Sequence, residues 1–406
     1  LYLKSFKCHI LIYLYKKMKK KVLIIFKYPH AWNENVIDKF SNYYDTDHLY
    51  ISEYKNLNFK EVIKSINDLI KSKSIDIAVF DVDYFKFINL FFIDKIISKK
   101  KVLIIGDDAG LHEFHSITAS ACDLILNSDP MGVLKYREKG YDSLFFQFEF
   151  GQLKHVPNIK KEIDVLFYGH LTADRKNYLE YIEKQGISVK NIGHESNTEG
   201  VSKDELLNLI EKTKIIINFS KTRTSFVQNL ESENIYQFYY QLKGKIIVAG
   251  LKGVMCVSEY SPGQELLFGK NEAPMFYTKE ECVKILKNLL QNEKLLIDRT
   301  NTFTAKVHEL CEDKKNFDPI YKILELESRK KIKLIKTPYW YLRIVAKQII
   351  LRNLRPAKML KNFLQINIIF SIIKNTNILT KFLIIAETII NIFWYPLIFI
   401  IKNKKL

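Results

Sequence analysis

The chain has 406 residues, 47% of them hydrophobic and 27% charged, which is enough for two α/β domains with separate cores. Its 14 glycines and 9 prolines exclude a fibrous repeat, and its five cysteines form no CxxC pair, which argues against a disulfide framework or a structural zinc site. Of the net charge of +18, residues 1–21 carry seven lysines and no acid, residues 328–406 carry sixteen basic residues and one acid, and the middle carries 40 basic and 44 acidic residues. This distribution disfavours a nucleic-acid-binding protein, which would place its basic face on the folded domain.

The first segment, residues 1–20, is predicted to be a basic extension. Met18 is a possible true start, because three lysines follow it and lead directly into an apolar run. Lysines interrupt the apolar residues before Met18 and no small-residue cleavage site follows, so the segment does not fit a signal peptide. We therefore expect the folded part to be cytoplasmic.

Residues 21–150 alternate between strand-like and helix-like runs. The expected strands are Val22–Phe26, Leu49–Tyr54, Ile75–Phe80, Val102–Ile105, Leu124–Leu126 and Ser143–Phe150. The expected helices are Phe59–Ser72, Phe85–Ser98 and Pro130–Lys139, and a polar loop is expected through Pro29 and Asn33. This rhythm predicts a parallel sheet covered by helices, that is, a first Rossmann-like domain.

A polar cluster follows the strand Val102–Ile105. Its members are Asp107, Asp108, His112, Glu113 and His115. A carboxylate or imidazole at a strand end could deprotonate an acceptor hydroxyl, so Asp107, Asp108, His112 and His115 are the catalytic candidates. The alternative is an ordinary polar loop. No third ligand accompanies the two histidines, so no metal site is expected.

After a predicted linker at 151–162, the same rhythm restarts over 163–327. The expected strands are Ile163–Tyr168, Ile187–Ile192, Ile215–Asn218, Met255–Ser258 and Met275–Tyr277. The expected helices are Arg175–Gln185, Lys203–Lys212, Tyr236–Ala249 and Lys279–Leu290. Two successive α/β units predict a ligand in the cleft between them, at the carboxyl ends of the strands.

Groups suited to an anion recur in this second unit. They are Gly169 and Arg175 after the first strand, Ser220, Lys221 and Arg223 after the third, Lys243 and Lys245 before a helix, and Pro262, Gly263, Gln264 and Glu265 at a turn. A glycine admits close backbone approach, helix N-termini offer free amides, and cationic side chains pair with phosphate oxygens. Amides after the Pro262-Gly263 turn are expected to point into the cleft.

The run Gln241–Phe268, QLKGKIIVAGLKGVMCVSEYSPGQELLF, resembles the C-terminal signature of group 1 glycosyltransferases, closest to the branch resembling the spore maturation protein CgeB. Asn218–Arg223 and Asp164–Gly169 resemble other segments of that family, and the likeness covers about residues 21–290. The resemblance implies a GT-B fold, with a nucleotide-sugar donor on the second domain and the acceptor on the first. It also implies that Lys243 and Lys245 face the donor diphosphate, assisted by Lys221 or Arg223, and that the Ser261–Glu265 turn lies beside the sugar or its phosphates.

The sequence departs from the family pattern at one position, and a second glycosyltransferase motif in it lies in the wrong domain. Val248 stands where the family usually has a glutamate that binds the donor ribose, and Glu265 is the candidate to take part of that role. Asp81-Val-Asp83 matches the metal-nucleotide motif of the other major glycosyltransferase fold, but it lies in the wrong domain. It is interpreted as a loop and helix cap.

Residues 328–406 are predicted to be a basic, membrane-associating tail. Phe382–Ile401 is apolar over about the minimum length for a span, although Glu387, Asn391 and Pro396 oppose one. Tyr339–Phe370 has a basic amphipathic pattern suited to an anionic membrane surface. The alternative is a C-terminal helix that packs back on the core.

These observations predict a glycosyltransferase that moves a sugar from a nucleotide-diphosphate donor to a glycolipid or surface-polysaccharide acceptor at the cytoplasmic membrane face. No cofactor, metal or nucleic-acid partner is expected. The departure at Val248 leaves open a non-catalytic scaffold or binding subunit of a glycan-assembly complex.

Overall fold

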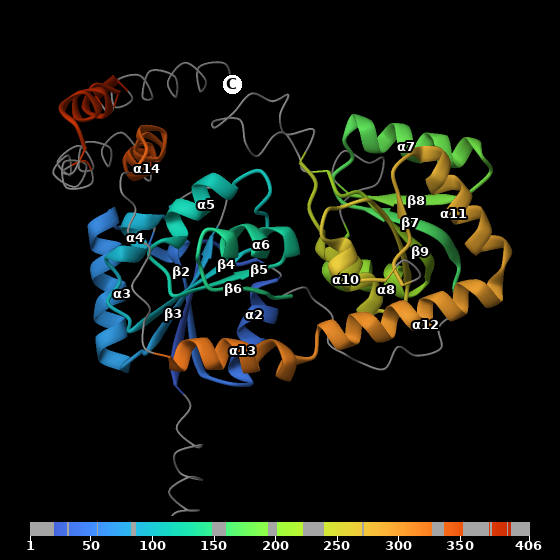
Figure 1. Cartoon of the computed structure of the whole chain (residues 1–406), viewed down its shortest axis with the longest axis horizontal. Helices are drawn as coiled ribbons and strands as arrows, with labels where there is room; N and C mark the ends of the chain where they lie inside the picture. Colours follow the sequence, from blue (N-terminus) through green and yellow to red (C-terminus); the bar gives the residue numbers. More distant parts are fainter. Residues whose placement is uncertain are drawn as a thin grey trace, which may run out of the picture.

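The computed structural model describes residues 20–30, 32–54, 56–82, 87–147, 160–193, 201–221, 239–269, 272–326, 337–351, 373, 376–387 and 389–390. Arg223, Asp83 and most of the predicted linker lie outside this set. Figure 1 shows two α/β domains side by side, with two long helices running along one side of both. Each domain contains one wholly parallel sheet, so the predicted pair of Rossmann-like domains is confirmed.

The first sheet has six strands in the order β2-β1-β3-β4-β5-β6. Their bounds are β1 Lys21–Phe26, β2 Asp45–Tyr50, β3 Ile77–Val82, β4 Lys100–Ile105, β5 Leu124–Asn127 and β6 Ser143–Phe145. Strands β1, β3 and β5 are almost wholly buried, as expected for apolar runs with helices on both faces of the sheet. Asp81 lies inside β3 and is buried, so its interpretation as a loop residue was wrong.

The helices of the first domain are α2 Asn33–Ser41, α3 Phe59–Lys73, α4 Leu90–Asp94, α5 His112–Ala119 and α6 Pro130–Glu138, with a 3₁₀ turn η1 at Ile51–Tyr54. Helix α3 starts where Asn58 and Glu61 form a capping box. Four expectations were wrong. The strand expected at Ser143–Phe150 ends at Phe145. Residues from Asn33 form a helix instead of a loop. The strand expected at Leu49–Tyr54 lies earlier in the chain, because β2 ends at Tyr50. The helix expected at Phe85–Ser98 is limited to the short α4, which Asn89 caps.

The second sheet has five strands in the order β11-β10-β9-β7-β8. Their bounds are β7 Ile163–Tyr168, β8 Val189–Ile192, β9 Thr213–Asn218, β10 Met255–Glu259 and β11 Met275–Phe276. The helices are α7 Ala173–Lys184, α8 Lys203–Glu211, α10 Gly244–Leu251 and α11 Lys279–Gln291, with a 3₁₀ turn η3 at Gln264–Leu266. Helix α10 begins at Gly244, eight residues after the expected start, so Lys243 is its N-cap.

Two further helices, α12 Glu293–Leu310 and α13 Asp313–Glu325, carry the chain back to the first domain (Figure 1). Helix α12 packs on α10, whereas Phe317 of α13 stacks on Tyr43 with ring centroids 4.4 Å apart and lies edge-on to Phe40 at 5.3 Å. The expected second domain, 163–327, therefore includes a helix that belongs to the first core. Three aromatic rings pack together there, which the sequence pattern alone does not reveal.

Helix α14, Tyr339–Leu351, also docks on the first domain. Tyr341 is fully buried and stacks on Phe114 of α5 with centroids 4.6 Å apart, and its hydroxyl bonds Thr118 and the amide of Leu90 at 2.9 and 2.8 Å. The start of the predicted tail thus packs on the core, which was the alternative interpretation. No helix within the described residues is both long and apolar enough to cross a bilayer.

Candidate functional site

The part of the candidate site that lies in the second domain forms where the second sheet reverses its strand order. Strand β8 lies on one side of β7 and β9 lies on the other, so the loops that follow β7 and β9 diverge. Ligands of parallel α/β sheets sit at such switch points, outside the carboxyl ends of the strands. Gly169 follows β7 and Ser220 and Lys221 follow β9, so the structure places these candidates at that crevice.

Lys245 occupies the centre of this crevice. Its ammonium donates to the carbonyl of Tyr168, and a Cβ at Gly169, which has φ +117°, would lie 2.8 Å from its Nζ. Burial, together with the neighbouring cations Arg175 and Lys243, lowers the pKa of Lys245 to about 7. A cluster of like charges with too little counter-charge is the electrostatic signature of an anion site.

Arg175 and Lys221 connect the two diverging loops. The buried guanidinium of Arg175 donates to the carbonyl oxygens of His170 and Lys221, at 2.8 and 3.2 Å. Lys221 forms an ion pair with Asp174 at 3.6 Å. Arg175 thus holds the crevice in shape, and Lys221 is the more available cation.

Glu259, at the end of β10, fixes the loop after β9. Its carboxylate accepts from the amides of Ser220 and Lys221 at 2.9 and 3.2 Å. Burial raises the pKa of Glu259. The two hydrogen bonds from backbone amides and the nearby cations Lys221 and Arg175 only partly offset that effect. The Ser220 hydroxyl donates a hydrogen bond to the backbone carbonyl of Glu259 at 2.7 Å, so it helps to hold the same loop in place.

The Pro262-Gly263 turn contacts the first domain. A Cβ at Gly263, which has φ +86°, would lie 2.9 Å from Met131 of α6. The backbone amide of Gln264 donates to the backbone carbonyl of Ser261 at 3.1 Å, so the expectation that this amide points into the cleft was wrong. The side chains of Gln264 and Ser261 are fully buried and have no hydrogen-bond partner among the described residues, whereas Glu265 is exposed.

Val248 lies on the inner face of α10. It is 1% exposed and belongs to the hydrophobic core of the second domain. A glutamate at this position would point into that core. The valine is therefore consistent with the local packing.

Asp108 organises the part of the candidate site that lies in the first domain. It is buried and accepts from Nδ1 of His112 at 2.8 Å, from Nδ1 of His115 at 3.0 Å, and from Tyr136 and Asn127. Burial alone would raise the pKa of Asp108, but the bonds from the two histidines hold it well below its usual range. All its acceptor capacity is used, so Asp108 serves as an ionised anchor and is not available as a base.

The anchor orients the two histidines differently. With Nδ1 bonded to Asp108, His112 turns Nε2 towards Ser116, whose hydroxyl lies 3.2 Å away. The Nε2 of His115 is buried without a partner among the described residues. His112 borders a cavity, so of the four catalytic candidates only His112 combines a carboxylate anchor with access to a ligand.

Asp107 faces the second domain. It forms an ion pair with Lys243 at 3.2 Å and accepts from the amide group of Gln241, whose oxygen also bonds the Ala109 amide at 3.2 Å. Asp129 accepts from the amide of Leu242, and burial together with Asp108 raises the pKa of Asp129 to about 7. The candidate-site loops of the two domains are therefore in direct contact.

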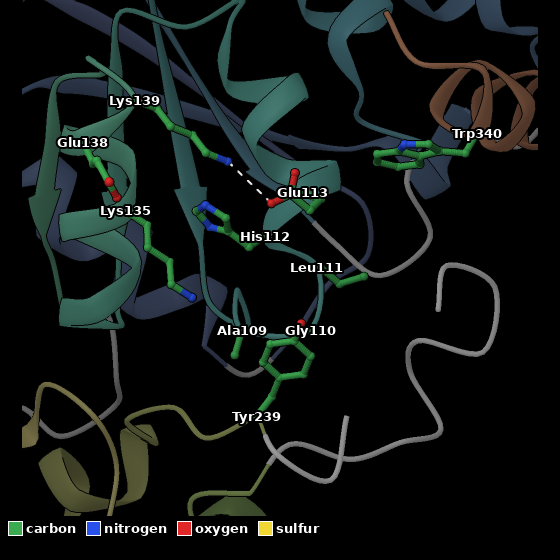
Figure 2. A pocket seen from close by; sticks show the side chains of 10 residues that line it. All are labelled: Ala109, Gly110, Leu111, His112, Glu113, Lys135, Glu138, Lys139, Tyr239 and Trp340. Atoms are coloured by element: carbon green, nitrogen blue, oxygen red, sulfur yellow. Dashed lines mark ion pairs between the residues drawn. The ribbon is translucent and has the colours of Figure 1, made fainter. Parts of the chain in front are cut away.

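A cavity of about 470 Å³ opens beside His112. Figure 2 shows that its walls come from the loop Ala109–Leu111, from α5 and α6, from Tyr239 and from Trp340 of α14. Lys135, Glu138 and Lys139 line it from α6 and the residue after it, and Lys139 pairs with Glu113 at 3.6 Å.

No protein-family model and no curated protein sequence matches the chain. Among solved structures, the HepE protein of Anabaena in complex with UDP and glucose is 10% identical with a TM-score of 0.54, and the match covers 75% of this chain and 99% of that one. Sucrose-phosphate synthase from Thermosynechococcus elongatus is 7% identical with a TM-score of 0.51, over 75% of this chain and 99% of that one. These likenesses confirm the GT-B fold.

Several residues of the site were not predicted from the sequence. They are Gln241, Asp129, Glu259, Tyr239 and Trp340. Glu259 stands in the recognised run, so its place at a strand end was an available signal. Gln241 opens the same run, but its contacts with Asp107 and Ala109, like the places of Asp129, Tyr239 and Trp340, depend on segments that are distant in the sequence.

Proposed function

We propose that this chain transfers a sugar from a nucleoside diphosphate sugar to an acceptor hydroxyl. The observation that carries the proposal is the cluster of Arg175, Lys221, Lys243 and Lys245 at the switch point of a GT-B fold. Pre-arranged cations stabilise the negative charge that develops on a leaving diphosphate, so no metal is required for this step.

On the acceptor side, we assign the general base to His112. Asp108 favours the tautomer in which Nδ1 carries the proton, so the Nε2 lone pair can accept the proton of the acceptor hydroxyl. As the acceptor oxygen bonds the sugar carbon, the bond from that carbon to the diphosphate oxygen breaks and the diphosphate leaves with the electron pair. Ser116 now bonds Nε2, and the acceptor hydroxyl would replace it.

The donor is proposed to carry uridine. UDP and glucose occupy the HepE structure, which supports testing UDP-hexoses first. Glu265 is exposed beside the turn that contacts α6 and is proposed to accept from the ribose hydroxyls. Placement in the branch resembling the spore maturation protein remains a prediction.

The acceptor is proposed to be a glycolipid or a surface polysaccharide at the cytoplasmic membrane face. The support is the basic end of the chain and the exposed apolar residues Ile378, Leu379, Phe382 and Ile390, which are 85, 66, 68 and 61% exposed. Basic and apolar groups together suit an anionic lipid surface.

The test uses the full-length chain with calorimetry and a transfer assay. We expect UDP to bind and at least one sugar of a panel of uridine, guanosine, cytidine and thymidine diphosphate sugars to be transferred or slowly hydrolysed. His112→Asn should reduce turnover by about 10²–10⁴-fold and leave UDP affinity unchanged. Lack of binding by the whole panel would sink the proposal, whereas donor binding without turnover, equal in wild type and Lys243→Ala, would indicate a non-catalytic scaffold.

A further inference from the structure

The cavity beside His112 has two aromatic walls that come from outside the first sheet. Tyr239 lies in the segment that leads to α10, and Trp340 lies on α14, so three distant parts of the chain converge there (Figure 2). Trp340 is half-buried and is anchored through its neighbour Tyr341, which is fully buried against α5. The position of the indole is thus fixed relative to the helix that carries His112.

The charged side chains that line the cavity are balanced. Lys135 and Lys139 are matched by Glu113 and Glu138, and Lys139 is already engaged by Glu113 at 3.6 Å and by Ser116 at 3.0 Å. In the crevice of the second domain, Lys221 and Lys243 likewise pair with Asp174 and Asp107, but Lys245 forms no ion pair among the described residues and lies beside Arg175. The cavity therefore does not concentrate anions and is a poor site for a phosphate group.

Aromatic faces combined with carboxylates and ammonium groups suit a different ligand. The C–H face of a sugar ring packs on an aromatic ring, and its hydroxyls can both donate to carboxylates and accept from ammonium groups. The volume of about 470 Å³ lies within the range of small-molecule sites. His112 in the same wall would face a hydroxyl of that sugar.

We propose that this cavity binds an uncharged saccharide, the terminal sugar of the acceptor, stacked on Trp340. The C-terminal segment is therefore a working part of the acceptor site through α14. The role as acceptor site rests on the proposed function, but saccharide binding can be measured without donor or turnover.

The test is saturation-transfer NMR on the full-length chain with lactose, cellobiose, maltose and N-acetylchitobiose, and with pyrophosphate and glycerol phosphate as anionic probes. We expect at least one disaccharide to bind, and to compete with neither UDP nor pyrophosphate at the donor crevice. Trp340→Ala should weaken that binding at least about tenfold, and Trp340→Phe should weaken it less, because a ring face remains. UDP affinity should be unchanged in both variants.

A second variant guards against loss of folding in Trp340→Ala. Lys135→Met with Glu138→Gln changes only polar groups on the cavity side of α6, and Leu134→Ala on the same helix is the matched control, since Leu134 is 43% exposed and does not line the cavity. The double variant should lose saccharide binding and the control should keep it. The proposal is overturned if no disaccharide binds, if only the anionic probes bind in the cavity, or if the folded variants bind as well as the wild type. A UDP affinity measured in parallel keeps this result separate from the proposed transfer.

Discussion

Lys245 keeps its ammonium group between the Tyr168 carbonyl and two other cations, Arg175 and Lys243, in a half-buried position. The pKa of about 7 in the folded chain lies below the ordinary 10.5 of the unfolded chain. Between these two pH values the unfolded state binds more protons, so the free energy of unfolding rises with pH across that window. The site thus holds Lys245 at a cost to stability near neutral pH.

Lys245→Met should therefore separate stability from ligand binding. We expect the free energy of unfolding at pH 7 to increase by at least about 1 kcal/mol, because a strained charge is replaced by an apolar chain of similar length. UDP affinity should fall by roughly 10–100-fold, since a charge-assisted bond is lost. Denaturant unfolding and calorimetry check the two effects, and a variant that loses stability and keeps UDP affinity would contradict this assignment.

The same lysine predicts proton uptake on binding. A diphosphate beside Lys245 would raise its pKa above 7, so at pH 8 binding should take up close to one proton, and at pH 6 almost none. UDP affinity should consequently fall as pH rises above 7. Calorimetry at pH 8 in buffers with different ionisation enthalpies measures the uptake, and Lys245→Met is the control that should show none.

At the level of elements, the parallel strands could be predicted because they are apolar runs buried on both faces, such as Val22–Phe26 and Ile215–Asn218. Helix α2 escaped prediction because its N-cap, Trp32, makes no side-chain capping bond, so no start signal exists. A basic amphipathic helix such as α14 has the same pattern whether its apolar face meets lipid or core. Among the site residues, the pattern indicated Gly169 and Lys243 beside the crevice, but it could not indicate that Arg175 and Gln264 are buried.

Helix α14 should contribute measurably to the stability of the first domain. Tyr341→Phe removes the hydroxyl that bonds Thr118 and the Leu90 amide, so we expect a loss of about 1–3 kcal/mol in the free energy of unfolding. Tyr341→Ala should cost about 3–5 kcal/mol through the cavity it leaves. Tyr277→Phe, at a residue 63% exposed, is the control that should change little. Unchanged hydrogen exchange in α5 of both Tyr341 variants would rule out this docking.

For the whole molecule, the helical segment 378–387 carries the exposed apolar face and is tied to α14 by the contact of Arg343 with Glu387. This contact places a proposed lipid-binding surface beside the helix that supplies Trp340 to the saccharide cavity. A membrane contact would then hold the acceptor pocket close to the lipid surface.

The membrane proposal predicts that the full-length chain floats with vesicles containing phosphatidylglycerol and less well with pure phosphatidylcholine. Leu379→Glu with Phe382→Glu should reduce vesicle binding at least about tenfold, because two exposed apolar contacts are lost and negative charge is added. Ile297→Glu, at an exposed residue of α12, is the matched control and should bind as the wild type does. Wild-type protein that ignores anionic vesicles would refute the proposal.

The course of the chain has a consequence for its synthesis. The first core is completed by residues that come late in the chain, from Phe317 of α13 and Tyr341 of α14 to Ile373 and Ile384, whereas the elements of the second domain lie between Ile163 and Leu310. A ribosome therefore delivers every part of the second domain before these last parts of the first core. We expect the second domain to reach its native form on the nascent chain while the earlier-made domain still exposes apolar surface, the reverse of the usual N-terminal-first order.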